Sequence, residues 1–364
     1  MSQQATPGSR AGHGSPAAMQ QARRIVDPPA AGAGGSPRGN LAALDLGTNN
    51  CRLLIARPEG EGFVIVDAFS RIVRLGEGLA GTGRLSDAAI ERTVSALSVC
   101  ADKLRRRRVV LARSVATEAC RRAENGAEFV DRVHRETGIM LDIISAHEEA
   151  RLAVLGCQSL LEPGDGPALI FDIGGGSTEL ALLDGRQPGP GIVDWESAPW
   201  GVVSLTEAVS GHEDSAAGRA AAYAQMRETM RRAFASFATR LPAQGPVRLL
   251  GTSGTVTTLA TVFLGLPRYD RQAVDGLIVP AEEMRAIATR LSGMSMAERR
   301  GLPCIGEERA DLVVAGCAIL ESILDIWPAA RLGVADRGIR EGILRMLLGS
   351  RAIRRAPRRE SAAA

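Results

Sequence analysis

The chain has 364 residues, which is long for one domain and sufficient for two, each with its own core. Apolar residues make up 45% and charged residues 23%, the composition of ordinary soluble globular proteins. The net charge of +3 is too small to indicate a nucleic-acid-binding protein, and the 3% aromatic share argues against a base-stacking surface. Lys103 is the only lysine, and arginine suits phosphate oxygens, although a GC-rich coding bias explains the same preference.

The cysteines and histidines give no sign of a metal cluster. The six cysteines form no CxxC pair, and the four histidines lie far apart in the sequence. Buried free thiols in a reducing compartment are the expectation for such cysteines. There is no apolar segment of a signal peptide and no run of about 18 apolar residues. These features predict a cytoplasmic protein that binds neither membranes nor nucleic acid.

The first part of the chain alternates between strands and helices after an unstructured segment. Residues 1–40 are rich in Ala, Gly, Ser, Pro and Gln without apolar periodicity, which predicts a disordered tail. Three short segments separated by turn residues then predict an antiparallel meander. Apolar residues at spacings of four and three predict a helix over 86–107. The strands and helices expected in this half cover 41–46, 52–57, 63–70, 86–107, 109–115, 117–122, 140–145 and 147–161.

A Pro/Gly cluster at residues 162–166 (EPGDG) separates the two halves. We therefore expect an N-terminal domain over 41–163, a C-terminal domain over 164–350 and a second disordered tail over 351–364. The second half again begins with three strands and continues with helices and strands, so it repeats the plan of the first. This repetition predicts two duplicated α/β domains with a ligand-binding cleft between them. The elements expected in this half cover 168–173, 178–184, 192–197, 215–239, 247–250, 254–263, 281–291, 308–326 and 332–335.

The strongest functional signal is a pair of related strand–turn segments, residues 44–50 (LDLGTNN) and 171–179 (FDIGGGSTE). In each, an apolar strand delivers an Asp and is followed by a glycine turn with hydroxyl or amide side chains. The N–H groups of such a turn can surround an anion, and the Asp can hold a divalent cation against the same phosphate. One copy alone could be an ordinary hairpin, but two matching copies favour a phosphate site. The candidate residues are Asp45, Gly47, Thr48, Asn49, Asn50, Asp172, Gly174, Gly175, Gly176, Ser177 and Glu179.

A third turn, residues 251–258 (GTSGTVTT), follows a predicted strand and opens a helix. Its N–H groups and the helix dipole could hold a further phosphate through Gly251, Thr252 and Ser253, although Ser and Thr are also common helix N-caps. No lysine follows, so it is not a Walker A loop.

Two charged segments complete the candidate site. Residues 145–151 (SAHEEAR) place Glu148 and Glu149 at the start of a helix, where the dipole alone favours carboxylates. Beside a phosphate site, however, a carboxylate can position and deprotonate a water. Arg121 follows a strand and could clamp phosphate oxygens, with a solvated helix face as the alternative.

Together these segments resemble the exopolyphosphatase and guanosine pentaphosphate phosphatase family, within the superfamily of acetate kinase, sugar kinases, Hsp70 and actin. The similarity runs from Ala42 to about Leu348 and includes residues 335–342 (ADRGIREG). It implies an α/β protein with two duplicated ribonuclease-H-like domains and an active site in the cleft between them. A homodimer is a further implication.

The resemblance also assigns roles to residues. It implies that Glu149 activates the attacking water, and that Asp172 and Glu179 hold Mg²⁺ or Mn²⁺ while Glu179 assists catalysis. It implies that Arg121, residues 48–50 and residues 174–177 bind phosphate and that Asp45 faces the same cleft. The first loop departs from many relatives at Cys51 and Arg52, which we expect to tune substrate choice. No His-Asp pair of the longer relatives' helical domain is found, so the short two-domain form is expected.

The predicted function is therefore an exopolyphosphatase, which releases terminal orthophosphate from inorganic polyphosphate by metal-assisted, in-line attack of water. A guanosine pentaphosphate phosphohydrolase with the same machinery is the alternative. Phosphoryl transfer to a nucleoside diphosphate and a non-catalytic phosphate-binding regulator are further hypotheses. The sequence leaves open the choice between the first two, the chain-length preference, the metal and the oligomeric state.

Overall fold

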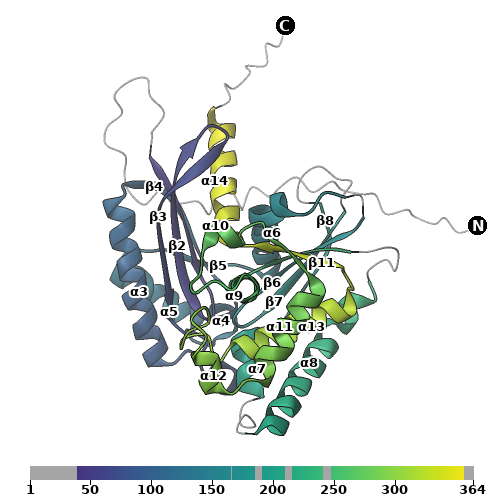
Figure 1. The fold of residues 1–364 in the computed structure, drawn as a ribbon. Helices are drawn as coiled ribbons and strands as arrows, with labels where there is room; N and C mark the ends of the chain where they lie inside the picture. Colours follow the sequence, from purple (N-terminus) through teal and green to yellow (C-terminus); the bar gives the residue numbers. More distant parts are fainter. Residues whose placement is uncertain (1–38, 165, 185–190, 210–214, 241–246, 356–364) are drawn as a thin grey trace, which may run out of the picture.

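The computed structural model describes residues 39–164, 166–184, 191–209, 215–240 and 247–355 (Figure 1). The expected N-terminal tail therefore lies outside the described residues up to position 38, and the expected C-terminal tail lies outside them from 356 onward. Residues 351–355, predicted as part of that tail, are instead the last turn of helix α14 (Ile339–Arg355). Ala and Arg favour helix, so the turn continues the packed helix before it.

The first sheet has the strand order β3-β2-β1-β4-β5. β2 is antiparallel to both of its neighbours, whereas β4 is parallel to β1 and to β5. Alternate residues of β1 face opposite sides of the sheet, so Ala42 and Leu44 pack with helices α3 and α5 while Leu41 and Ala43 pack with α14. The elements of this half are β1 (Asn40–Leu46), β2 (Asn50–Glu59), β3 (Gly62–Ile72), α2 (Leu79–Thr82), α3 (Asp87–Arg106), β4 (Val109–Ala116), α4 (Glu118–Arg122), α5 (Gly126–Thr137) and β5 (Leu141–Ile143).

The second sheet has the order β10-β11-β9-β6-β7-β8. Its strands β8-β7-β6-β9-β11 repeat the order and the directions of the first sheet, and β10 is an extra antiparallel edge strand. This repetition confirms the prediction of two duplicated ribonuclease-H-like α/β folds. The strands are β6 (Ala168–Ile173), β7 (Thr178–Leu183), β8 (Ile192–Ala198), β9 (Arg248–Thr252), β10 (Ile278–Pro280) and β11 (Arg331–Ala335).

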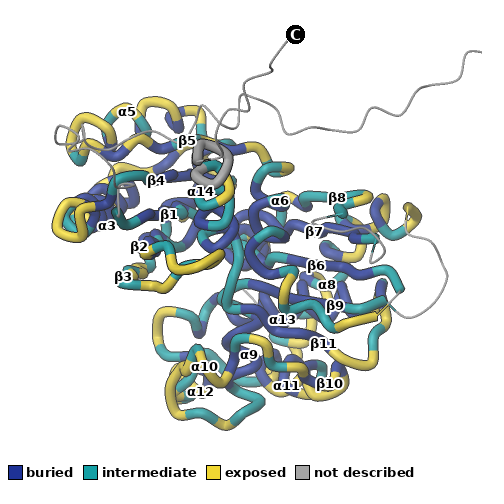
Figure 2. The backbone as a smooth tube through the Cα atoms, turned by 90° about the horizontal axis from the view of Figure 1, so that it is seen from above, coloured by how far each residue is buried: buried dark blue, intermediate teal, exposed yellow. Residues whose placement is uncertain are grey.

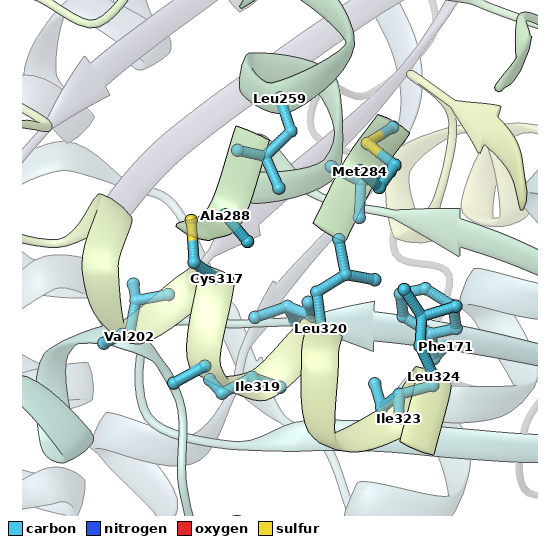
Figure 3. Close-up of a cluster of buried hydrophobic side chains, with 14 of the residues drawn as sticks. Phe171, Val202, Leu259, Met284, Ala288, Cys317, Ile319, Leu320, Ile323 and Leu324 are labelled. Atoms are coloured by element: carbon cyan, nitrogen blue, oxygen red, sulfur yellow. The ribbon is translucent and has the colours of Figure 1, made fainter. Parts of the chain in front are cut away.

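The largest core lies between the second sheet and a group of helices around α13. Every residue of α13 from Val313 to Leu324 is buried. Figure 3 shows Leu259, Met284 and Leu320 gathered in this core. α13 begins five residues later than the predicted helix over 308–326, so residues 308–312 are free to form a turn. The helices of this half are α7 (Val202–Ala208), α8 (Ala216–Ala238), α9 (Gly254–Phe263), α10 (Arg271–Val274), α11 (Ala281–Gly293), α12 (Met296–Arg300) and α13 (Val313–Ile326).

Two helices connect the halves. α6 (Ala146–Cys157, followed by the 3-10 turn Gln158–Leu160) comes after β5 but also packs against the second sheet, whereas α14 comes after β11 and packs against the first. The two helices lie side by side between the sheets (Figure 2). A Cβ on Gly342 of α14 would lie 2.0 Å from the Leu152 oxygen of α6, so the two backbones can lie in contact at this point only because the residue is glycine. The domain boundary between residues 163 and 164 stays a prediction. α14 belongs to the second half of the sequence but packs against the first sheet.

Within the described ranges, no helix combines the length and the apolar content needed to cross a bilayer.

Candidate functional site

A cleft with a volume of about 140 Å³ lies between the two halves. Both predicted glycine turns line it, together with Glu149, Glu179 and the turn at 252–255. Residues 336–340, at the start of α14, complete its wall. The cleft therefore brings together segments that lie up to about 300 positions apart in the sequence. This is possible because strands of two similar sheets end at the same place.

The first turn is fixed by its backbone. The Gly47 N–H donates to the Asn50 oxygen at 2.9 Å, and the Asn49 oxygen accepts the N–H groups of Val73 and Arg74 at 2.9 and 3.0 Å. Thr48 and Asn49 are buried. The Asn49 Oδ1 atom is buried without a hydrogen-bond partner among the described residues. The turn therefore presents an unsatisfied polar atom at the cleft.

The second turn repeats the first and lies against it. The Gly174 N–H donates to the Ser177 oxygen at 2.9 Å, as Gly47 does to Asn50. A Cβ on Gly175 would lie 3.0 Å from Thr48 Cβ, and one on Gly176 would lie 2.6 Å from Thr48 Oγ1. Glycine at these positions lets the two turns approach so closely that one small anion could contact both.

Three acidic residues from the two strand pairs are desolvated at this point. Burial and the charge of Asp45 together raise the pKa of Asp172 to about 6. Burial and the charge of Asp172 raise the pKa of Glu179 to about 7, although Ser177 and Ser197 donate to its Oε1 at 2.7 and 3.0 Å. Burial also raises the pKa of Asp45, against the charges of two arginines. Such a cluster binds cations or protons.

Glu149 enters the same cleft from α6. Ser145 caps that helix by accepting the Glu148 N–H, so Glu149 stands in the first turn. Its side chain is buried, and Arg121 Nη1 donates to its Oε2 at 3.0 Å. Burial and then the charge of Glu179 raise the pKa of Glu149 well above its usual range, although Arg121 opposes this. A carboxylate with a raised pKa is a competent proton acceptor near neutral pH.

The neighbouring Glu148 does not line the cleft. It accepts hydrogen bonds from Arg113 at 2.8 Å and from Arg151 at 2.7 Å. Although burial opposes it, these bonds lower the pKa of Glu148. Two adjacent carboxylates on one helix thus have opposite electrostatic surroundings, and only Glu149 faces the two glycine turns.

Two predicted site residues do not line the cleft. Arg121 donates to Glu118 Oε2 at 2.6 Å and to the Ile144 oxygen at 2.8 Å as well as to Glu149, so it reaches the cleft through these partners. Gly251 lies inside β9, where a Cβ would come within 2.6 Å of the Phe171 ring. The other predicted residues of that turn, Thr252 and Ser253, do line the cleft.

Ser253 has a backbone conformation that rarely suits a residue with a side chain. Its φ of 120° lies in the region that favours glycine. Its Oγ accepts the Thr255 N–H at 3.2 Å and so caps α9. Thr252 Oγ1 donates to the Arg337 oxygen at 2.6 Å, which joins this turn to the start of α14. Strain of this kind is often retained at ligand-binding positions.

Several residues of the cleft were not predicted from the sequence. Glu118, Arg309, Asp336, Arg337 and Arg340 line the cleft without having been predicted. Arg309 lies in a turn at residues 308–312, where the sequence had predicted the start of a helix. Its Nη1 donates to Thr258 Oγ1 at 2.8 Å. The segment 335–342 had matched the family pattern, which was the available signal for Arg340.

The carboxylates fit a divalent cation that is shared with a substrate. No group of three His, Cys, Asp or Glu side chains within the described part of the chain is arranged to hold a metal by itself. Asp45 Oδ1, however, is buried without a hydrogen-bond partner in that part, beside the desolvated Asp172. Mg²⁺ usually keeps several waters and binds through one or two carboxylates plus substrate phosphates, which this donor set can supply.

Comparison with known proteins agrees with this geometry. The profile of the Ppx/GppA phosphatase family matches residues 54–351. Exopolyphosphatase 2 of Mycobacterium tuberculosis is 32% identical in an alignment of 325 residues that covers 85% of this chain and 98% of that protein. The guanosine-5'-triphosphate,3'-diphosphate pyrophosphatase of Aeromonas hydrophila is 29% identical over 85% of this chain and 59% of its own length. The crystal structure of the Aquifex aeolicus Ppx/GppA family member covers 87% of this chain and 99% of its own, with 28% identity and a TM-score of 0.69. The chain belongs to the Ppx/GppA phosphatase family.

Proposed function

We propose that this chain is an exopolyphosphatase that releases orthophosphate from the end of inorganic polyphosphate. The observation that carries the proposal is the contact between the two glycine turns, with the buried carboxylate of Glu149 in the same cleft. The similarity to exopolyphosphatase 2 over nearly the whole length of that relative supports the substrate class.

Glu149 is the proposed general base. A water between Glu149 and the terminal phosphorus gives its proton to the carboxylate as its oxygen forms the new P–O bond. The bond between that phosphorus and the bridging oxygen breaks, and the shortened chain leaves with the electron pair. Arg121 holds Glu149 Oε2 at 3.0 Å and so orients the base. N–H groups of both turns receive the charge that develops on the phosphoryl oxygens.

Asp172 and Glu179 are the residues that we expect to hold Mg²⁺ or Mn²⁺, with Asp45 facing them. When bound, the cation neutralises phosphate charge and polarises the phosphoryl oxygens. Ser177 and Ser197 keep Glu179 Oε1 in a fixed position by donating to it, so the second turn and the carboxylate move as one unit. We also propose a cytoplasmic location, supported by six free cysteines of which five are buried, and a homodimer.

A guanosine pentaphosphate phosphohydrolase is the second candidate. The similarity to the A. hydrophila pyrophosphatase over 85% of this chain supports it. The same turns and the same base would remove the terminal phosphate of the nucleotide, so the two candidates differ only in what lies beyond the reacting phosphorus.

The test is orthophosphate release from long-chain polyphosphate, tripolyphosphate and guanosine pentaphosphate, compared by kcat/KM on one preparation. We expect the highest value for polyphosphate. A higher value for guanosine pentaphosphate would favour the second candidate. No release from any of the three, with Mg²⁺ or Mn²⁺ supplied, would favour a non-catalytic phosphate-binding protein.

A further inference from the structure

Arg340 is a cation of the cleft that no protein group neutralises by direct contact. It is the second residue of α14 and lines the cleft. Among the residues that the structure describes, its guanidinium has no hydrogen bond and no ion pair, although five N–H donors need acceptors. Arg340 is partly exposed, so these donors are accessible to a ligand in the cleft.

The acidic residues next to Arg340 are already bound by other cations. Arg271 Nε lies 3.1 Å from Asp336 Oδ2, and its Nη2 lies 2.9 Å from Glu341 Oε1. Glu341 Oε2 also accepts the Gly338 N–H at 3.0 Å. Arg337 is paired with Asp275 at 2.7 Å. The ion pairs around the start of α14 are thus complete without Arg340.

Across the cleft, Asp45 and Arg340 are close enough to influence each other's charge, yet they form no ion pair. Asp45 Oδ1 is buried and has no hydrogen-bond partner in the described part of the chain. Burial lowers the pKa of the Arg340 guanidinium although Glu341 opposes it, and the like charge of Arg52 lowers it further. Asp45 and Arg340 therefore line one cleft without forming an ion pair with each other.

We propose that Arg340 binds the substrate, with its guanidinium fork donating to phosphoryl oxygens of the polyphosphate chain. This inference rests on the proposed function. A phosphate group in that space supplies the acceptors that Arg340 lacks, and a cation or water on the same phosphate supplies a partner for Asp45. The planar fork matches two oxygens of one phosphate, which a lysine at this position would not do.

The test is the binding of tripolyphosphate to the full chain in excess EDTA, measured by isothermal titration calorimetry, with melting followed by circular dichroism. R340Q removes the charge, and R340K keeps the charge but loses the fork. R345Q is the matched control, because Arg345 lies on the same helix, donates to Ser159 Oγ at 3.2 Å and does not line the cleft.

We expect R340Q to raise the Kd about ten-fold or more, as the loss of charged hydrogen bonds implies, with R340K between it and the unmodified protein. R345Q should bind normally. The Tm of R340Q without ligand should equal or exceed that of the unmodified protein, because Arg340 makes no hydrogen bond or ion pair with the described residues and feels the like charge of Arg52.

Equal affinity in R340Q and the unmodified protein would overturn the inference. Failure of R340Q to fold, or a large fall in its Tm, would also overturn it, because Arg340 would then be structural. If the unmodified chain neither binds tripolyphosphate nor hydrolyses polyphosphate, the proposed function fails as well. If the chain hydrolyses polyphosphate while R340Q binds normally, only the role of Arg340 fails.

Discussion

The two strand–turn segments are alike in backbone and differ in charge. In both, an Asp and a residue seven positions later are paired across an antiparallel hairpin, Asp45 with Arg52 and Asp172 with Glu179. Both turns close with the same 2.9 Å hydrogen bond. The first segment thus pairs an acid with a cation, and the second pairs two acids. The two copies thus share one backbone geometry, and we expect the residue paired with each Asp to decide whether that copy favours a polyanion or a metal.

The largest effect should come from Glu149, which both turns face. Glu149→Gln keeps the size of the side chain and removes the proton acceptor, so kcat for polyphosphate should fall by about 10²–10⁴. The Kd for tripolyphosphate should stay equal or improve, since a negative charge near a polyanion is lost. The measurement is steady-state phosphate release beside calorimetric binding.

Glu148→Gln is the control for that variant, although the structure changes what it should do. Glu148 is paired with the fully buried Arg113, so its loss should cost about 1–3 kcal/mol in the free energy of unfolding. The kcat of the folded protein should remain near normal. A large loss of kcat at Glu148 with little effect at Glu149 would mean that the base has been assigned to the wrong carboxylate.

A glycine-to-alanine change should disturb the contact between the two turns at Gly175 but not at Gly47. Gly175→Ala forces a Cβ to within 3.0 Å of Thr48 Cβ, whereas a Cβ on Gly47 of the first turn would meet only the Asn50 oxygen at 3.6 Å. Gly175→Ala should therefore destabilise the fold by about 1–3 kcal/mol and lower kcat/KM, while Gly47→Ala should be tolerated. Denaturant unfolding and phosphate release measure both effects. Equal tolerance at both positions would show that the turns do not touch.

A smaller effect should appear in the pH dependence of stability. Because burial raises the pKa of Asp172 to about 6 and that of Glu179 to about 7, the folded state holds protons that the unfolded state has released. The metal-free protein should therefore lose stability as pH rises from about 4 to 7. Glu179→Gln should flatten this fall in a series of Tm measurements in EDTA. A Tm that rises over this range in the unmodified protein would contradict the assignment.

The sequence was sufficient for features that local order determines. The glycine turns, their Asp residues and the position of Glu149 at a helix start follow from short spacings, and the repeated strand order follows from the repeated pattern. Arg309 and Arg340 could not be found this way, because distant segments bring them to the cleft. α14 packs against the first sheet, and its amphipathic pattern does not specify which sheet its apolar face contacts. Arg121 lies on α4 and donates to Glu118 of the same helix and to Glu149 of α6, and the second of these contacts depends on the tertiary fold.

The proposed roles of Arg52 in binding the polyanion and of Glu179 in binding the metal can be tested directly. The measurement is a Mg²⁺ titration of the paired variants Arg52→Gln and Glu179→Gln at a fixed polyphosphate concentration. We expect Glu179→Gln to raise the half-saturating Mg²⁺ concentration by about ten-fold or more, the usual cost of losing a group that holds or orients a metal. Arg52→Gln should leave that concentration nearly unchanged and raise the KM for polyphosphate instead. The same shift in both variants, or a shift in Arg52→Gln alone, would contradict the proposal that Arg52 acts on the polyanion and Glu179 on the metal.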